Sequence, residues 1–193
     1  MRQRLSIADF DELLFERPED EKWELIGGQL VKGMVGSIVE HHLIIENVSF
    51  VLSSHLRSMG MPCRVYRETF YLRSERNGLM ALPDIMVRCG KIDPEAPSVD
   101  DPVVLMEVVS PGSESKDRAI KRVAYQRLPS LQHFVLIARD EALIDVYSRR
   151  EDGCHGAPPL TALYQMLRLP AIEFEMPLGE VYRDVLEGVG GKS

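Results

Sequence analysis

Two short apolar runs constrain this sequence most. Residues 83–87 and 102–109 are almost entirely apolar and lack polar alternation, which is typical of strands buried on both faces of a sheet. Each run contains one acid, Asp84 in the first and Glu107 in the second. A carboxylate in a buried strand is costly unless a partner charge, a hydrogen bond or a cation compensates it. If the two strands are neighbours, their acids form an oxygen-rich site for a hard divalent cation such as Mg²⁺.

The rest of the chain predicts one α/β domain with a mixed sheet flanked by helices. Apolar residues at helical spacing predict helices over residues 6–16, 40–59, 116–128 and, near the end, 179–186. The length of 193 residues fits a single domain over residues 1–187, followed by a flexible tail at 188–193.

Strand patterns surround the two apolar runs. They predict an N-terminal hairpin that turns at Gly27 and Gly28, a strand over 63–72, a surface loop over 90–101, a strand pair at 132–137 and 143–148, a loop at 153–159 and then a C-terminal hairpin. The mixed order of helices and strands shows no internal boundary.

The charge distribution does not exclude a polyanionic partner such as nucleic acid. The net charge of −7 argues against nucleic acid, because Lys and Arg supply most of the affinity for phosphates. The excess of acid is local, however, since residues 9–24 contain eight acids and two basic residues. Residues 57–76 contain five arginines, and residues 116–127 contain five basic residues and one acid. Two basic segments therefore lie inside an acidic protein, and the helix expected over the second could be a solvated face, although its concentration of positive charge favours a contact with a phosphate backbone.

Neither a membrane span nor a cysteine framework is expected. No apolar run reaches the roughly 18–20 residues that a bilayer requires, and the first residues lead into acids rather than an apolar signal core. We therefore expect a cytoplasmic protein. The three cysteines, Cys63, Cys89 and Cys154, are odd in number and widely spaced, which predicts neither a disulfide framework nor a zinc site.

The helix expected after Glu107 carries a lysine that suits this chemistry. Asp117, Lys121 and Tyr125 recur at four-residue spacing and share one face of that helix, so Lys121 is able to point toward the acids. A lysine beside a cation and a phosphate stabilises the charge that develops on phosphorus, or helps to position and deprotonate the attacking water. These parts together predict phosphodiester hydrolysis.

An ordered set of residues between Glu24 and Tyr147 carries a family resemblance. The set comprises Glu24, Gly28, Pro83, Asp84, the run Glu107-Val108-Val109-Ser110-Pro111, Asp117, Lys121 and Tyr125. It resembles the Uma-two family of endonucleases, members of the PD-(D/E)XK restriction-endonuclease-like superfamily.

The resemblance implies a restriction-endonuclease-like mixed sheet and a role for each motif residue. It implies that Asp84 and Glu107 hold Mg²⁺ or Mn²⁺, that the backbone carbonyl of Val108 is a further ligand, and that Glu24 is an additional acid near the site. The superfamily's usual lysine position, two residues after the glutamate, is here Val109. The resemblance therefore assigns the catalytic lysine to Lys121, with Asp117 one turn earlier.

The leading hypothesis is a metal-dependent endonuclease that hydrolyses DNA phosphodiester bonds. We expect a homodimer, because two copies of one site related by a two-fold axis cut two strands most simply. Two alternatives stay open. One is a catalytically inactive binding module of the same fold, in which the acids and Lys121 form an ion-pair network. The other is a metal-dependent hydrolase of a small phosphoester.

Several residues also have plain structural interpretations. Lys121 and Asp117 could form an ordinary ion pair on a solvated helix face. Glu24 could point outward from its strand, and Tyr125 could pack its ring and bond a neighbour through its hydroxyl. His41 and His42 open the long predicted helix, where histidines usually lie at the cap or the surface, so we place both outside the metal shell.

Overall fold

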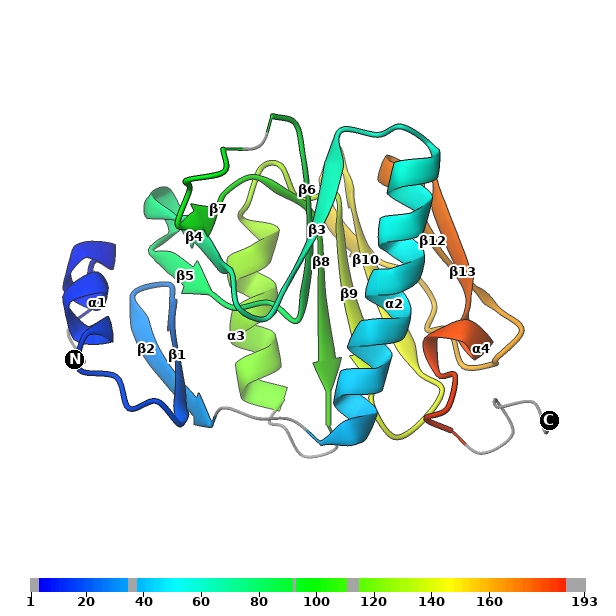
Figure 1. Ribbon diagram of the computed structural model, residues 1–193, viewed down its shortest axis with the longest axis horizontal. Helices are drawn as coiled ribbons and strands as arrows, with labels where there is room; N and C mark the ends of the chain where they lie inside the picture. The colour runs from blue at the N-terminus through cyan, green and yellow to red at the C-terminus, as the bar shows by residue number, and fades with distance from the viewer. Residues whose placement is uncertain (1–3, 35–37, 92, 111–114, 187–193) are drawn as a thin grey trace.

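The central sheet of the computed structural model is mixed (Figure 1). The structure describes residues 4–34, 38–91, 93–110 and 115–186. The sheet runs in the order β11-β10-β9-β8-β6-β3, and within it β8 and β9 are parallel whereas the other neighbours are antiparallel. Its strands are β3 (Cys63–Arg67), β6 (Ile85–Cys89), β8 (Pro102–Val109), β9 (His133–Ala138), β10 (Ile144–Arg150) and β11 (Gly153–Gly156).

A second sheet lies on one side of the central sheet, and a hairpin lies on the other (Figure 1). The second sheet runs in the order β2-β1-β5-β4-β7 and comprises β1 (Glu21–Ile26), β2 (Gln29–Met34), β4 (Tyr71–Ser74), β5 (Leu79–Ala81) and β7 (Ser98–Val99). The hairpin pairs β12 (Met166–Leu169) with β13 (Phe174–Pro177). Short 3-10 helices, η1 (Glu75–Asn77) and η2 (Pro170–Ile172), lie between strands of these two units.

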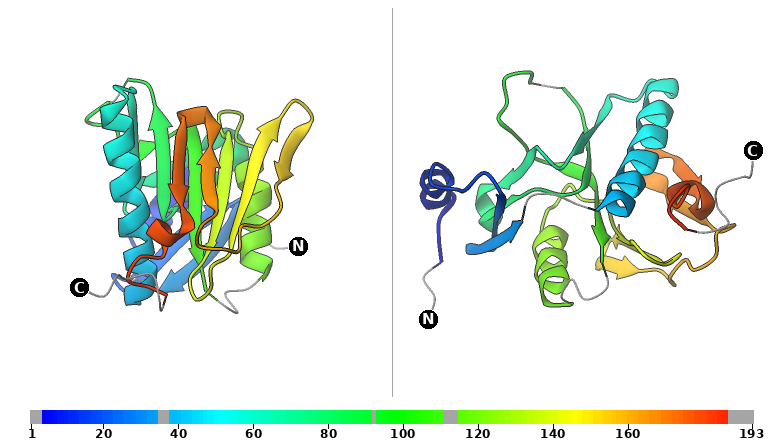
Figure 2. Two further views of the ribbon diagram at one scale, coloured as in Figure 1. Left: turned by 90° about the vertical axis from the view of Figure 1, so that its right-hand side faces the viewer. Right: turned by 60° about the horizontal axis from the view of Figure 1, so that its bottom comes forward.

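Apolar side chains cover the central sheet on both faces. Helix α2 (Val39–Ser58), the β12–β13 hairpin and α4 (Leu178–Val181) pack on one face, and α3 (Ser115–Gln126) and the second sheet pack on the other (Figures 1 and 2). Helix α1 (Ile7–Leu14) covers the far side of the second sheet. Along β8, Met106 and Val108 face the α2 side, whereas Leu105 faces the α3 side. Glu107 is two residues after Leu105, so the alternation of a strand directs it toward α3.

The two acids meet because of the register between β6 and β8. These strands are antiparallel neighbours, and Ile85 pairs with Met106. Continuing that register by one residue places Asp84 level with Glu107, with both side chains on the same face. Residues 82–84 also connect the second sheet to the central one, since β5 ends at Ala81 and β6 begins at Ile85. The acids therefore lie in the corner where the two sheets diverge.

The fold class and most of the predicted elements are confirmed. The strand predicted over 63–72 is instead divided into β3 and β4, because Glu68 has a positive φ of 23° and turns the chain. The predicted loops at 90–101 and 153–159 contain β7 and β11, and the last helix is shorter than the predicted 179–186. The predicted tail at 188–193 lies outside the described residues.

The prediction that the cysteines form no disulfide is wrong for one pair. Cys63 and Cys89 are opposite residues of β3 and β6, and they form a disulfide across a sequence separation of 26. Linear spacing could not show this, because the pairing depends on the strand register. Disulfides are rare in the reducing cytoplasm, so this bond and the predicted cytoplasmic location require opposite redox conditions. Separately, no helix in the described part of the chain is both long and apolar enough to cross a membrane.

Reduction of this disulfide is expected to lower the free energy of unfolding by about 2–4 kcal/mol, because the bond restricts the unfolded chain. Urea denaturation with and without dithiothreitol measures the difference. Cys63→Ser should lose the same stability in the absence of reductant. Cys154→Ser is the matched control, since Cys154 is a free cysteine. Identical unfolding curves for the oxidised and reduced protein would show that the bond has no stabilising role.

Candidate active site

The predicted acids lie together in the corner between the two sheets. Glu24 on β1, Asp84 before β6 and Glu107 on β8 are all buried, with relative exposures of 6%, 5% and 8%. Three carboxylates this close in an apolar setting repel one another and lose hydration, so each needs a compensating partner. The partners come from α3, from backbone N–H groups and from α2.

Lys121 on α3 compensates two of the acids. Its Nζ lies 3.1 Å from Oε2 of Glu24 and 3.2 Å from Oε1 of Glu107. The helical spacing therefore predicted its direction correctly, since the ammonium points toward these two acids. Glu24 points inward rather than outward, and its Oε1 accepts a hydrogen bond of 2.7 Å from the backbone N–H of Leu82. This bond attaches β1 to the connection that carries Asp84.

Glu107 has a second partner one turn further along α3. The hydroxyl of Tyr125 donates a hydrogen bond of 2.8 Å to Oε1 of Glu107. The Tyr125 ring packs edge-on against Phe134, with 5.4 Å between ring centroids. The structural interpretation of Tyr125 is thus confirmed, and the neighbour that it bonds is a predicted metal ligand.

One carboxylate oxygen of Asp84 has two partners. The backbone N–H of Val108 donates to Oδ2 at 2.7 Å, and Nε2 of His41 lies 3.3 Å from the same oxygen. Burial raises the pKa of Asp84, but His41, Lys22 and the Val108 N–H outweigh it, so the pKa lies below its ordinary value. Asp84 is therefore ionised at neutral pH.

Burial has different consequences for Glu107 and Lys121. Burial raises the pKa of Glu107 to about 7, since the attraction of Lys121 is opposed by Asp84 and Glu24. Burial would lower the pKa of Lys121, but the charges of Glu107, Glu24 and Asp84 raise it above its ordinary value. Lys121 is thus a permanent cation at neutral pH.

The sequence analysis missed two residues beside Asp84. His41, near the start of α2, and Glu68, in the turn between β3 and β4, each offer one ligand atom that lies within 4.8 Å of a carboxylate oxygen of Asp84 and of each other. This group could hold a metal ion. The sequence pattern predicts His41 outside the metal shell, and no periodicity signals its approach, because α2 reaches Asp84 only through tertiary packing. Glu68 lay inside a predicted strand.

Two predicted roles are not tested by this geometry. Asp117 lies on α3, but its side chain belongs to the part of the helix that the structure does not describe. Val108 donates its N–H to Asp84, while the ligand role predicted for its carbonyl stays a prediction. The fit of a divalent cation is supported by the donors present, since carboxylate oxygens and an imidazole nitrogen converge here.

Known proteins share the sequence pattern and the fold of this chain. Residues 7–179 match the family model Uma2, described as "Putative restriction endonuclease". The uncharacterized protein slr1290 of Synechocystis is 28% identical over 142 residues, which cover 73% of each chain. The crystal structure of a protein from Anabaena variabilis, described as a "putative nuclease belonging to DUF820", superposes with a TM-score of 0.73. That match has 16% identity and covers 94% of this chain and 99% of the other, which shows the common fold.

Proposed function

We propose that this chain, which belongs to the Uma2 family as its ordered motif residues predicted, is a metal-dependent endonuclease that hydrolyses DNA phosphodiester bonds. One observation carries the proposal: a partly buried lysine, whose side chain is 16% exposed, lies between two buried glutamates, next to an ionised aspartate. Buried charges in this number are costly for a scaffold, and groups of this kind concentrate at functional sites.

Asp84 and Glu107 are the proposed ligands, with the carbonyl of Val108 as the further ligand that the family resemblance implies. When bound, a divalent cation such as Mg²⁺ or Mn²⁺ supplies Lewis-acid stabilisation of the charge that develops on the phosphate. The Val108 N–H and Tyr125 hydroxyl orient the two carboxylates through their bonds to Asp84 and Glu107.

Lys121 acts in this proposal as a cation and not as a base. Its raised pKa keeps the ammonium protonated at neutral pH, so it can stabilise negative charge on a phosphate but cannot accept a proton from water. Glu24 positions this ammonium, and Asp117 one turn earlier on α3 is proposed to support it. Of the two roles that the sequence left open for Lys121, charge stabilisation is the better supported.

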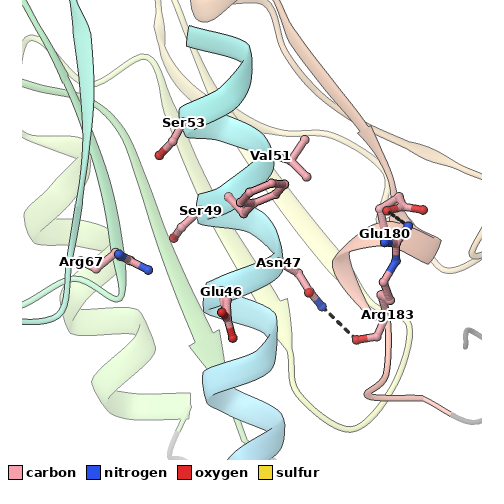
Figure 3. A pocket seen from close by; sticks show the side chains of 9 residues that line it. Glu46, Asn47, Ser49, Val51, Ser53, Arg67, Glu180 and Arg183 are labelled. Atoms are coloured by element: carbon pink, nitrogen blue, oxygen red, sulfur yellow. Dashed lines mark hydrogen bonds and ion pairs between the residues drawn. The ribbon is translucent and has the colours of Figure 1, made fainter. Parts of the chain in front are cut away.

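The DNA backbone is proposed to reach the site along α2. A groove of about 560 Å³ beside this helix is lined by, among others, Ser49, Ser53 and Arg67. Figure 3 shows Arg67 extending toward α2 on the side where the two serines lie. Ser49 is buried, and its hydroxyl has no hydrogen-bond partner among the described residues. Hydroxyl and guanidinium groups donate hydrogen bonds to phosphate oxygens. Arg67 directly precedes Glu68, so the groove lies close to the site.

Two cations of the basic helix α3 already have partners among the described residues. Lys121 is engaged by acids, and Arg122 bonds the Tyr147 hydroxyl at 3.2 Å while its guanidinium lies 5.3 Å from that ring. Arg122 therefore already has a partner within the protein, and Lys121 lies at the site itself rather than on an outer surface of the helix.

Arg67→Ala is expected to weaken DNA binding and to reduce the slope of log K against log salt by about 1, because one phosphate contact is lost. Fluorescence anisotropy of a labelled duplex between about 50 and 200 mM salt, in EDTA, measures both quantities. Arg168→Ala is the control, since Arg168 is exposed on β12 and pairs with Glu175. A slope that is unchanged in Arg67→Ala places the backbone elsewhere.

A second candidate function is a binding module without hydrolysis. Lys121 satisfies both glutamates at once, which is what a structural ion-pair network requires. A third is hydrolysis of a small phosphoester, which needs no surface for a polymer. Supercoiled plasmid incubated with the protein and Mg²⁺ or Mn²⁺ separates the three.

The endonuclease converts the plasmid to nicked and linear forms, and EDTA abolishes the conversion. An intact plasmid, together with hydrolysis of bis(p-nitrophenyl) phosphate, favours the small-phosphoester enzyme. An intact plasmid and an intact phosphodiester favour the binding module. Light scattering during size-exclusion chromatography tests the homodimer that we propose for cutting two strands.

A further inference from the structure

His41, Glu68 and Asp84 form a ligand group on the α2 side of the site. Each offers one ligand atom, and these atoms all lie within 4.8 Å of one another. We propose that this group binds a divalent transition ion such as Mn²⁺ through an imidazole nitrogen, at a position that does not use Glu107. The inference deepens the proposed function, on which it rests through the shared Asp84.

The separation between His41 and Asp84 suits two ligands of one ion. Nε2 of His41 lies 3.3 Å from Oδ2 of Asp84. A charge-assisted hydrogen bond between such groups is usually shorter, at about 2.7–2.9 Å. Two adjacent ligands that are each about 2.0–2.2 Å from one ion are separated by roughly 3.0–3.5 Å. The observed distance therefore fits a shared cation better than a direct bond.

The His41 ring is not tied into a network that a cation would have to break. One ring nitrogen faces Asp84, and the other, Nδ1, is buried without a hydrogen-bond partner among the described residues. Glu68 is fixed beside it, since its backbone N–H donates to the carbonyl of Asp84 at 3.4 Å.

Glu107, unlike His41, is tied to several partners. Both of its carboxylate oxygens lie within 3.3 Å of the Lys121 ammonium, and one also accepts from Tyr125. Glu107 is not a member of the group formed by His41, Glu68 and Asp84. A cation on the α2 side therefore displaces no partner of Glu107.

The donor set selects the class of metal. Mg²⁺ prefers oxygen ligands and retains its waters, whereas an imidazole nitrogen suits first-row transition ions. A set of one imidazole and two carboxylates should thus bind Mn²⁺ more tightly than Mg²⁺, because only the transition ion gains from the nitrogen ligand.

Titration of the 193-residue chain with Mn²⁺, followed by electron paramagnetic resonance, tests the site without DNA. His41→Ala is expected to weaken Mn²⁺ binding at least about tenfold. His42→Ala is the matched control, because His42 is the next residue, is exposed and faces Glu46 at 3.9 Å. Glu68→Gln should weaken binding as well, and Glu107→Gln should leave this binding event in place. Equal Mn²⁺ affinity in wild type and His41→Ala overturns the inference, as does Mg²⁺ binding as tight as that of Mn²⁺.

A measurement on the unmodified protein covers the case in which His41→Ala fails to fold. Electron spin echo envelope modulation of bound Mn²⁺ should show coupling to an imidazole ¹⁴N, and the absence of that coupling overturns the proposal. The readouts also separate this inference from the nuclease proposal. Nitrogen-coupled Mn²⁺ without plasmid cleavage contradicts only the nuclease, and cleavage with a nitrogen-free Mn²⁺ site contradicts only the ligand set.

Discussion

Asp84→Asn is expected to reduce metal-dependent DNA cleavage by at least about a thousandfold, which corresponds to roughly 4 kcal/mol of transition-state stabilisation. Asp84 belongs to both proposed ligand sets, so its loss of charge removes the carboxylate that either position requires. Asparagine keeps an oxygen able to accept the Val108 N–H, which should preserve the fold. Initial rates of plasmid nicking, with circular dichroism to verify folding, measure the effect.

Asp100→Asn provides the control for this experiment. Asp100 has a side chain that is 71% exposed, and its contact with Arg88 is a distant 4.0 Å. The control should cleave at the wild-type rate. If folded Asp84→Asn retained more than about a tenth of the wild-type rate, Asp84 would have no role in the chemistry.

Lys121→Met is expected to lower both stability and activity. Methionine fills a similar volume but leaves Glu24 and Glu107 buried without a counter-charge, so we expect a loss of about 3–5 kcal/mol in the free energy of unfolding. Cleavage should also fall, because the cation that faces the phosphate is gone. Urea denaturation measures the first effect and plasmid nicking the second.

The double variant Lys121→Met with Glu107→Gln separates the two effects. Glutamine removes one unpaired charge and still accepts the Tyr125 hydroxyl, so much of the lost stability should return while cleavage stays absent. Arg127→Met is the control, since Arg127 directly follows the same helix and is exposed, and the stability of this variant should change by less than about 0.5 kcal/mol. A Lys121→Met protein as stable as wild type would contradict the claim that Lys121 compensates the buried charges of Glu24 and Glu107.

The sequence predicted the central strands and the face of α3 that points toward the acids because both depend on local patterns. Residues 83–87 and 102–109 have no polar alternation, and this marks buried strands wherever they lie in a sheet. The four-residue spacing from Lys121 to Tyr125 fixes one helix face, and the structure turns that face toward Glu107. An acid inside such a strand requires a partner, so Glu107 could be singled out without coordinates.

The remaining features depend on contacts between distant segments. The Cys63–Cys89 disulfide follows from the pairing of β3 with β6, which no spacing rule supplies. His41 approaches Asp84 because α2 packs across the central sheet, and Glu68 does so because the chain turns where one continuous strand was predicted. The residue pattern within one helix or turn does not predict which distant segment it will contact.

A crystal of the wild-type protein soaked in Mn²⁺ gives the most direct measurement of the cation site on which the proposed chemistry depends. Anomalous scattering should place an ion in contact with the Asp84 carboxylate, either toward His41 and Glu68 or toward Glu107. An anomalous map without a peak at Asp84, with the ammonium of Lys121 still bound to both glutamates, would contradict the account.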